Sequence, residues 1–197
     1  ELLGSIINKV ANVGIILIVI IFQDEIRNFI AKLFNRTATN KLIRRIKKIV
    51  FKIDDSSHTS GIEQITQAVF NCAKTKTGVL IVVEQGAELT HYGLSGEVID
   101  AEINSRLIEN IFFKNTPLHD GAMIISKDRI MAAGCILPVS NRTDIPKHLG
   151  LRHRAGLGMT EKTDALVIVV SEETGKVSCI HQGNLKLNLN KEDLTSF

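Results

Sequence analysis

The segment PLHDGA at positions 117–122 places a histidine, an aspartate and a glycine side by side, directly before an apolar stretch. A glycine lets a substrate approach the backbone closely, while the carboxylate of Asp120 is suited to hold a metal ion or to take a proton. The imidazole of His119 is a further candidate metal ligand. The same letters also suit an ordinary turn that leads into a strand, so this segment alone leaves both interpretations open.

A basic triplet, Arg152-His153-Arg154, lies further along the chain between Gly150 and Gly156. The flanking glycines predict a loop whose backbone amides are accessible. Arginine forks match phosphate oxygens and neutralise the charge that develops on a pyrophosphate leaving group. The alternative is a solvated basic loop at the surface.

The third cluster, Ser171-Glu172-Glu173, stands at the end of the apolar run ALVIVV. Ligands of α/β sheets gather where strands end, so a hydroxyl and two carboxylates are well placed there. Carboxylate oxygens are the ligands that Mg²⁺ and Mn²⁺ prefer. A plain acidic hairpin turn explains the same residues.

Helical and strand patterns alternate through the part of the chain that contains these clusters. Ser60 and Glu63 form a capping box, and Ile65 and Val69 continue an apolar helical face after it. A second amphipathic helix is predicted around 103–112. Runs of β-branched and other apolar residues predict strands at 79–84, 122–126, 129–137, 165–171, 176–181 and 185–189. We therefore expect an α/β fold, with a single globular domain in which helices flank a mixed β-sheet.

The N-terminal part of the chain has a different character. The chain begins at Glu1, and we expect residues 1–22 to be an apolar, transmembrane helix that ends a truncated membrane anchor. A basic helical linker is expected at 23–60 and the globular domain at 61–197. The basic flank predicts that this domain lies on the cytoplasmic side of the cell membrane. A buried core helix is the alternative interpretation of the apolar run.

Composition excludes several classes of protein. The chain has no Trp and one Tyr, so we expect no nucleic-acid partner that is bound by stacking on aromatic rings. Its three cysteines form no CxxC pair, so neither a disulfide framework nor a zinc site is indicated. The common phosphate-binding patterns GxxxxGK[ST] and GxGxxG are absent, so any nucleotide chemistry uses a different cradle.

Taken together and in this order, HDGA, RHR and SEE resemble the diadenylate cyclase domain, and TPLHDGA, GCILP and LRHRA extend the match from Gly61 to the C-terminus. The apolar segment followed by QDEIR is similar to the last transmembrane helix of the family's membrane-anchored branch. The resemblance implies that two ATP molecules are joined into cyclic di-AMP and that two pyrophosphates are released. It also implies a divalent metal cofactor, Mn²⁺ or Mg²⁺.

The resemblance implies a role for each matching residue. The implied catalytic residues are Asp120, Arg152, His153 and Arg154. The implied contacts with ATP are Gly121, Ala122, Leu137 and Ser171, and the implied metal ligands are His119, Asp120 and Glu173. Leu151 stands where many family members have a threonine, so phosphate binding relies on the arginines and the backbone.

Two-fold symmetry of cyclic di-AMP predicts the assembly. One domain carries one copy of each cluster, so catalysis requires a face-to-face homodimer in which each 3′-hydroxyl meets the opposite α-phosphorus. Two other classes of function compete with this one. The first is a non-catalytic, membrane-tethered sensor that binds ATP, and the second is an adaptor whose basic linker binds anionic lipid or nucleic acid.

Overall fold

The structure, a computed structural model, describes residue 22 and residues 55–146 and 149–195. The chain divides into two compact units, Glu1–Lys52 and Ile53–Phe197. The predicted transmembrane helix and most of the predicted linker lie outside the described residues. Among the helices that are described, none has both the length and the apolar character to cross a bilayer.

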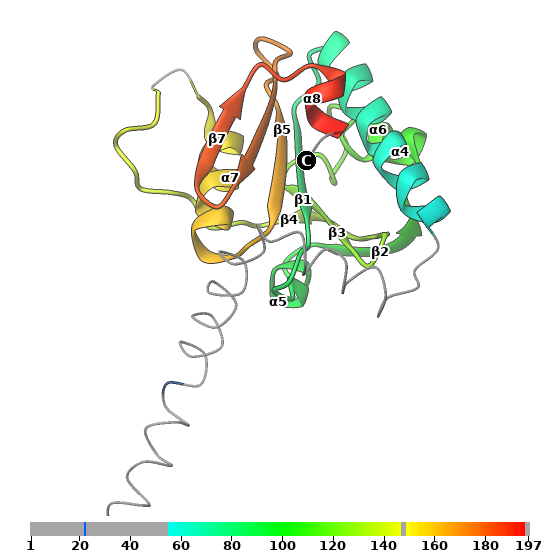
Figure 1. Cartoon of the computed structure of the whole chain (residues 1–197), viewed down its shortest axis with the longest axis horizontal. Helices are drawn as coiled ribbons and strands as arrows, with labels where there is room; N and C mark the ends of the chain where they lie inside the picture. The colour runs from blue at the N-terminus through cyan, green and yellow to red at the C-terminus, as the bar shows by residue number, and fades with distance from the viewer. Residues whose placement is uncertain (1–21, 23–54, 147–148, 196–197) are drawn as a thin grey trace, which may run out of the picture. The chain divides into compact units, whose positions relative to one another are not determined.

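Within the described part of the chain, seven strands form one sheet in the order β2-β4-β3-β1-β5-β6-β7 (Figure 1). The strands are β1 (Val79–Val83), β2 (Glu97–Glu102), β3 (Ala122–Ser126), β4 (Arg129–Cys135), β5 (Leu166–Val170), β6 (Val177–His181) and β7 (Asn184–Leu187). β1 and β3 run parallel, and every other neighbouring pair is antiparallel. The prediction of an α/β domain with a mixed sheet is confirmed.

Alternate residues of the central strand β1 face two separate cores. Val79 and Ile81 belong to the core under α4 (Asp55–Lys74), α6 (Ser105–Ile111) and α8 (Lys191–Thr195). Leu80 and Val82 belong to the core on the opposite face, under α5 (Thr90–Gly93) and α7 (Leu151–Lys162). This alternation is what a strand buried on both faces requires.

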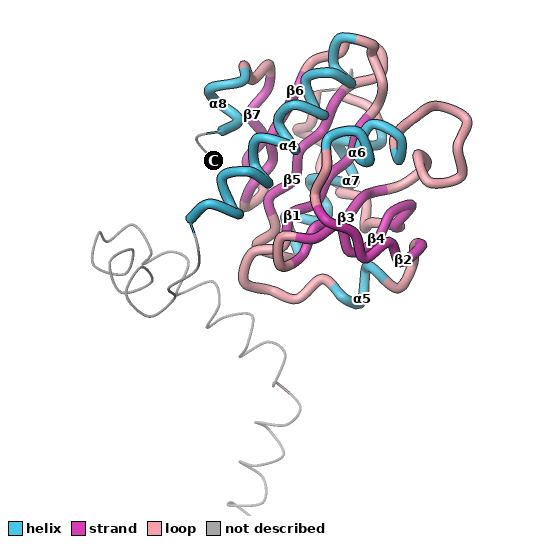
Figure 2. Tube along the Cα trace, turned by 90° about the vertical axis from the view of Figure 1, so that its right-hand side faces the viewer, coloured by secondary structure: helices cyan, strands magenta, loops and turns pink. Residues whose placement is uncertain are grey.

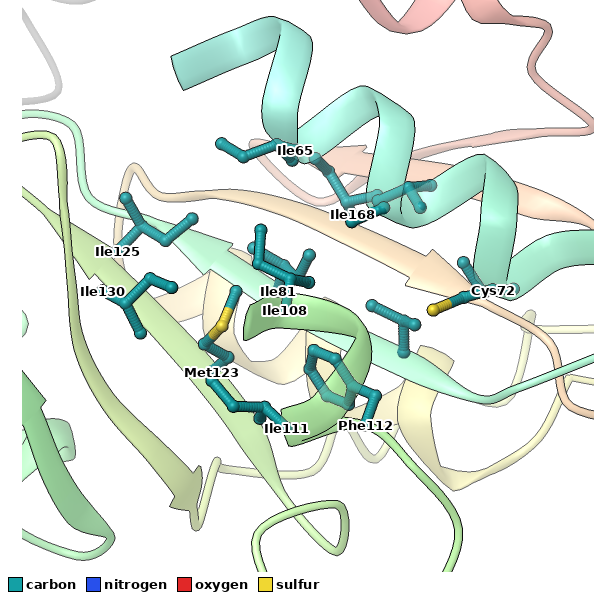
Figure 3. Close-up of a cluster of buried hydrophobic side chains, with 14 of the residues drawn as sticks. Ile65, Cys72, Ile81, Ile108, Ile111, Phe112, Met123, Ile125, Ile130 and Ile168 are labelled. Carbon is teal, nitrogen blue, oxygen red and sulfur yellow. The ribbon is translucent and has the colours of Figure 1, made fainter. Parts of the chain in front are cut away.

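The figures show how the helices are distributed over the sheet. α4 and α6 lie side by side on one face (Figure 2). Figure 3 shows the core beneath them, where Ile108 of α6 lies next to Ile81 of the central strand and Cys72 extends from α4. The sheet is therefore covered on both faces, and its strand ends remain as the places where a site can form.

Several predicted boundaries were wrong, and those of α4 and β4 matter for the site. α4 begins at Asp55, so Ser60 lies inside the helix and does not cap it. Serine and threonine are only weakly unfavourable in helices, and an aspartate in the first turn is stabilised by the helix dipole. Residues 55–60 of the polar segment are therefore helical and do not break the chain before the domain. β4 ends at Cys135, two residues before the predicted end at Leu137.

The basic triplet lies in a helix, which corrects the predicted loop. Gly150 is the N-cap of α7, and Arg152, the first arginine of the triplet, is in its first turn. The glycines at 156 and 158 are packing residues: a Cβ at Gly156 would lie 2.7 Å from Cδ1 of Ile180, and a Cβ at Gly158 would lie 2.3 Å from the carbonyl oxygen of Pro138. They let α7 approach the sheet and the loop after β4 closely.

Candidate active site

Strand register brings the predicted clusters to one edge of the sheet. Val79 at the start of β1 pairs with Val170 at the end of β5. Ala122 at the start of β3 pairs with Cys135 at the end of β4. Because β1 and β3 are parallel, both strands start at the same edge. The segments before β1 and β3, and those after β4 and β5, therefore lie along that edge.

The turn before β3 is held tightly against the end of β4. Gly121 has a φ of 154°, and a Cβ there would lie 2.5 Å from the backbone carbon of Gly134. Only glycine allows this approach of two backbones. The preceding residue, Asp120, is exposed, and Ala122 is buried at the start of β3. The turn thus presents one carboxylate to solvent next to a rigid backbone.

The imidazole of His119 is oriented by its own turn. Its Nδ1 hydrogen-bonds with the carbonyl oxygen of Thr116. Because a carbonyl oxygen only accepts, Nδ1 donates this hydrogen bond, which in the neutral imidazole puts the lone pair on Nε2. This is the tautomer in which metal-binding histidines are commonly held by a neighbouring carbonyl.

Arg152 joins all three clusters. Its Nη1 donates a hydrogen bond of 2.7 Å to Oε2 of Glu172, and its Nη2 donates one of 3.4 Å to the carbonyl oxygen of His119. The Arg152 side chain is 22% exposed, whereas that of Glu172 is 55% exposed. The guanidinium is therefore largely enclosed between the turn before β3 and the turn after β5.

Gly78 makes room for this ion pair. A Cβ at Gly78 would lie 2.6 Å from Nη1 of Arg152 and 3.0 Å from Oε2 of Glu172. Sequence reasoning gave Gly78 no part in the site, and it grouped Glu172 with Ser171 and Glu173 as candidate ligand-binding residues without pairing it to Arg152. The available signal was the pair of adjacent glutamates after a strand, but their spacing alone does not tell which one faces the arginine.

The other two residues of the triplet lie against different elements. His153 is 4% exposed, and its Nε2 is 3.2 Å from Oγ of Ser178 on β6. Nη1 of Arg154 is 3.5 Å from the carbonyl oxygen of Arg142, in the loop between β4 and α7. Arg152 is therefore the member of the triplet that reaches His119 and Glu172.

The end of β5 presents a hydroxyl and a carboxylate. Oγ of Ser171 accepts a hydrogen bond of 3.2 Å from the backbone N–H of Thr174, which leaves the hydroxyl proton available. Glu173 is exposed in the same turn. Among the residues that the structure describes, no three His, Cys, Asp or Glu side chains lie close enough to form a metal site. The chain alone therefore provides no complete cage from His119, Asp120 and Glu173.

A hollow of about 360 Å³ opens beside the end of β4. It is lined by His91, Tyr92, Ser95, Ile136, Leu137 and Pro138. Ile136 is 73% exposed, and its backbone N–H donates a hydrogen bond of 3.0 Å to Oγ of Ser95. Leu137 is 8% exposed and forms part of the wall. The lining is mostly apolar with a few polar atoms, as in pockets for flat organic ligands. Tyr92 and Ser95 were missed because no helix was predicted there.

The three cysteines take no part in this site. Cys72, Cys135 and Cys179 are free and buried. Burial raises the pKa of each thiol from 9.0 to about 11. They remain neutral thiols at physiological pH and fill the core.

Comparison with known families gives two matches along the chain. Residues 66–185 match the DAC family, described as DisA bacterial checkpoint controller nucleotide-binding. Residues 1–26 match the CdaA N-terminal transmembrane domain. The second match indicates that the chain is associated with a membrane.

Similar proteins and structures agree with these matches. The cyclic di-AMP synthase CdaA of Bacillus subtilis is 39% identical over 186 residues, which cover 92% of this chain. The chain spans 63% of the length of that relative. A crystal structure of a DacA double mutant from Staphylococcus aureus superposes with a TM-score of 0.71 at 39% identity, and covers 72% of this chain and 95% of that one. A membrane-spanning protein of Bacillus cereus superposes with a TM-score of 0.64 at 34% identity, and covers 87% of this chain and 80% of that one.

Proposed function

This chain belongs to the DAC family, and from that premise we propose that it is a diadenylate cyclase that condenses two ATP molecules into cyclic di-AMP and two pyrophosphates. The observation that supports this most is the position of Arg152. Its guanidinium lies between His119 and Glu172, at the edge of the sheet that also bears the exposed Asp120 and the hollow beside β4. A phosphate-binding fork, a carboxylate and an apolar hollow are the three groups that a nucleotidyl transfer from ATP needs.

The proposed reaction is a phosphoryl transfer that occurs twice. The 3′-hydroxyl of each ATP attacks the α-phosphorus of the other, and the bond from that phosphorus to the pyrophosphate oxygen breaks. Asp120 orients the hydroxyl and takes its proton. Arg152 and Arg154 stabilise the charge on the phosphoryl oxygens and on the leaving pyrophosphate.

The buried His153 has a positioning role in this proposal, because its contact with Ser178 ties the first turn of α7 to the sheet. The hydroxyl of Ser171 donates to a phosphate oxygen. The hollow that contains Leu137 holds the adenine, with Tyr92 and the exposed Ile136 beside the ring. Gly121 and Ala122 form the backbone floor under the ribose.

The residues present fit a divalent cation that is held jointly with the substrate. Mg²⁺ is usually bound by one or two carboxylates and by substrate phosphates, and not by a cage made of protein alone. We propose that His119, Asp120 and Glu173 supply the protein ligands of Mn²⁺ or Mg²⁺ once ATP is bound, since the described residues form no three-ligand site without it. The lone pair on Nε2 of His119 and the exposed carboxylates suit that role. When bound, the cation supplies Lewis-acid stabilisation of phosphate charge.

Assembly and location complete the proposal. The site edge, which is the edge of the sheet that carries Asp120, Arg152 and Glu172, meets the same edge of a second copy. This is because one active site holds one ATP and the product is two-fold symmetric. Residues 1–22 form the last helix of a membrane anchor, residues 23–60 link it to the catalytic domain at 61–197, and that domain lies on the cytoplasmic side. Tethering raises the local concentration of partner copies.

One experiment separates this function from its rival, a membrane-tethered ATP sensor without catalysis. The full chain in detergent micelles is incubated with ATP and Mn²⁺, and the products are identified by mass spectrometry. We expect one cyclic di-AMP for every two pyrophosphates, and no product when EDTA removes the metal. Saturable ATP binding without any cyclic di-AMP would establish the sensor instead.

A further inference from the structure

Glu172 is a carboxylate of the site edge that the proposed reaction does not use. Its neighbour Glu173 is a proposed metal ligand, whereas Oε2 of Glu172 accepts a hydrogen bond of 2.7 Å from Nη1 of Arg152. We propose that Glu172 is a positioning residue for Arg152, which fixes the guanidinium in the orientation that phosphoryl transfer requires. This inference rests on the proposed function.

The guanidinium is held at two of its three nitrogens. Glu172 engages Nη1, and the carbonyl oxygen of His119 engages Nη2. A guanidinium has five N–H donors in a rigid plane, so two anchored nitrogens fix the plane and leave the other donors for phosphate. Since the carbonyl of His119 belongs to the HDGA turn, this arrangement also sets the fork relative to Asp120.

The packing around Gly78 provides independent support for a fixed geometry of the Arg152–Glu172 ion pair. A side chain there would overlap Nη1 of Arg152 and come within 3.0 Å of the Glu172 carboxylate. The backbone before β1 thus forms the back wall of the ion pair. The pair is confined by β1, α7 and the turn after β5, three segments that are distant in sequence.

The expected energetics distinguish positioning from a structural role. Ion pairs as exposed as Glu172 contribute little to folding. Removing its charge therefore leaves stability almost unchanged, but frees the guanidinium to rotate away from the reacting phosphate. Misplacement by about 1 Å is enough to slow an enzyme roughly a hundredfold. The carboxylate is also a negative charge beside the phosphates, so its removal does not weaken ATP binding.

The test compares Glu172→Gln with Gly78→Ala and Asp100→Asn in the full chain. Gly78→Ala displaces Arg152 while keeping both charges. Asp100→Asn is a matched control, because Asp100 pairs with Arg129 at 2.7 Å between β2 and β4, away from the site. We expect kcat to fall about tenfold to a hundredfold in the first two variants and to stay unchanged in the control. Affinity for 3′-deoxy-ATP, which binds without reacting, is expected to be unchanged or higher in Glu172→Gln.

A double variant tests whether Glu172 acts through Arg152. In an Arg152→Ala background, Glu172→Gln should cause no further loss of kcat, because the group that it positions is gone. A full additional loss would overturn the proposal, as would a wild-type kcat in Glu172→Gln. Unfolding temperatures of the variants should match the wild type within the error of measurement.

A readout without turnover keeps this proposal separate from the proposed function. The Nε–Hε NMR signal of Arg152 should be sharp in the wild type and in Asp100→Asn, and broadened by motion in Glu172→Gln and Gly78→Ala. If the wild type makes no cyclic di-AMP, the proposed function fails, and this signal still decides the positioning role. An Arg152 signal that is identical in all four proteins would refute the positioning of Arg152 by Glu172.

Discussion

Replacing Gly158 by alanine should destabilise the domain although it improves helix propensity. The added Cβ would lie 2.3 Å from the carbonyl oxygen of Pro138, and its next neighbours are also backbone atoms. That separation is roughly 1 Å shorter than van der Waals contact, and backbone on both sides leaves no flexible side chain to yield. α7 and the loop after β4 therefore have to separate.

The change in the free energy of unfolding follows from three contributions, of which one stabilises the variant and two destabilise it. Alanine gains about 1 kcal/mol over glycine in a helix interior. Overpacking costs about 1–3 kcal/mol, occasionally more. The backbone hydrogen bond of 3.0 Å from the N–H of Ser140 to the carbonyl of Arg154 spans the same contact, and weakening it costs about 1 kcal/mol. The net loss is about 1–3 kcal/mol, which lowers the Tm by about 2–12 °C for a domain of this size.

Gly150→Ala is the matched control for this prediction. Gly150 is the N-cap of the same helix, its φ is −74°, and a Cβ there would have nothing within 4 Å. Glycine is a better N-cap than alanine by roughly 0.5–1 kcal/mol, so the Tm should fall by less than it does in Gly158→Ala. Urea unfolding of the full chain, followed by circular dichroism, compares the two variants. A Gly158→Ala protein at least as stable as Gly150→Ala would refute the close-packing argument.

Four further predictions concern the reaction, the assembly and the core. Asp120→Asn should lower kcat by a factor of about a hundred or more while ATP binding persists, and near-normal turnover with an intact fold would remove Asp120 from the mechanism. Alanine at Arg152 or Arg154 should weaken ATP binding or slow turnover by about 1.5–3 kcal/mol per lost hydrogen bond, with only partial rescue by lysine, and unchanged kinetics would make both arginines ordinary surface residues. Specific activity should rise with enzyme concentration before levelling off, and activity that stays flat where only monomer is detected would exclude the face-to-face dimer. Burial raises the thiol pKa values to about 11 in the folded state, so the stability that the neutral thiols contribute is complete below pH 9 and is lost as the pH rises from 9 to 11. Urea unfolding at a series of pH values should therefore show a shallower loss of stability in Cys135→Ala than in the wild type.

The sheet could be predicted from sequence because its signals are local. Runs such as VLIVV are too rich in β-branched residues for any other buried element. Only Lys127 and Asp128 separate two predicted strands, which is the length of a tight hairpin turn, so the pairing of β3 with β4 was foreseeable. Their φ values of 50° and 59° are those of such a turn. The edge strand β2 (EVIDAE) was missed because half of its residues are acidic and interrupt the apolar pattern.

The error at α7 has a different physical origin. Glycines normally weaken a helix, and the segment bounded by Gly150 and Gly156 was therefore predicted to be a loop. In the folded domain, contact with the sheet compensates for the low propensity, and that contact is possible only without side chains at 156 and 158. The residues that Gly156 and Gly158 approach are distant from them in the sequence, so no local sequence pattern predicts this contact.

The location of the site was expected for a reason that is only partly correct. The ligand was expected where strands end, and β4 and β5 do end at this edge, yet the parallel strands β1 and β3 present their amino ends to it. The segment Ser171-Glu172-Glu173 reaches them because β5 is antiparallel to β1, with Val170 opposite Val79. In a fully parallel sheet, the glutamates after β5 would lie at the opposite edge from the HDGA turn. The mixed order of the sheet is therefore what allows Arg152 to contact both His119 and Glu172, and a site that depends on strand direction is visible only once the topology is known.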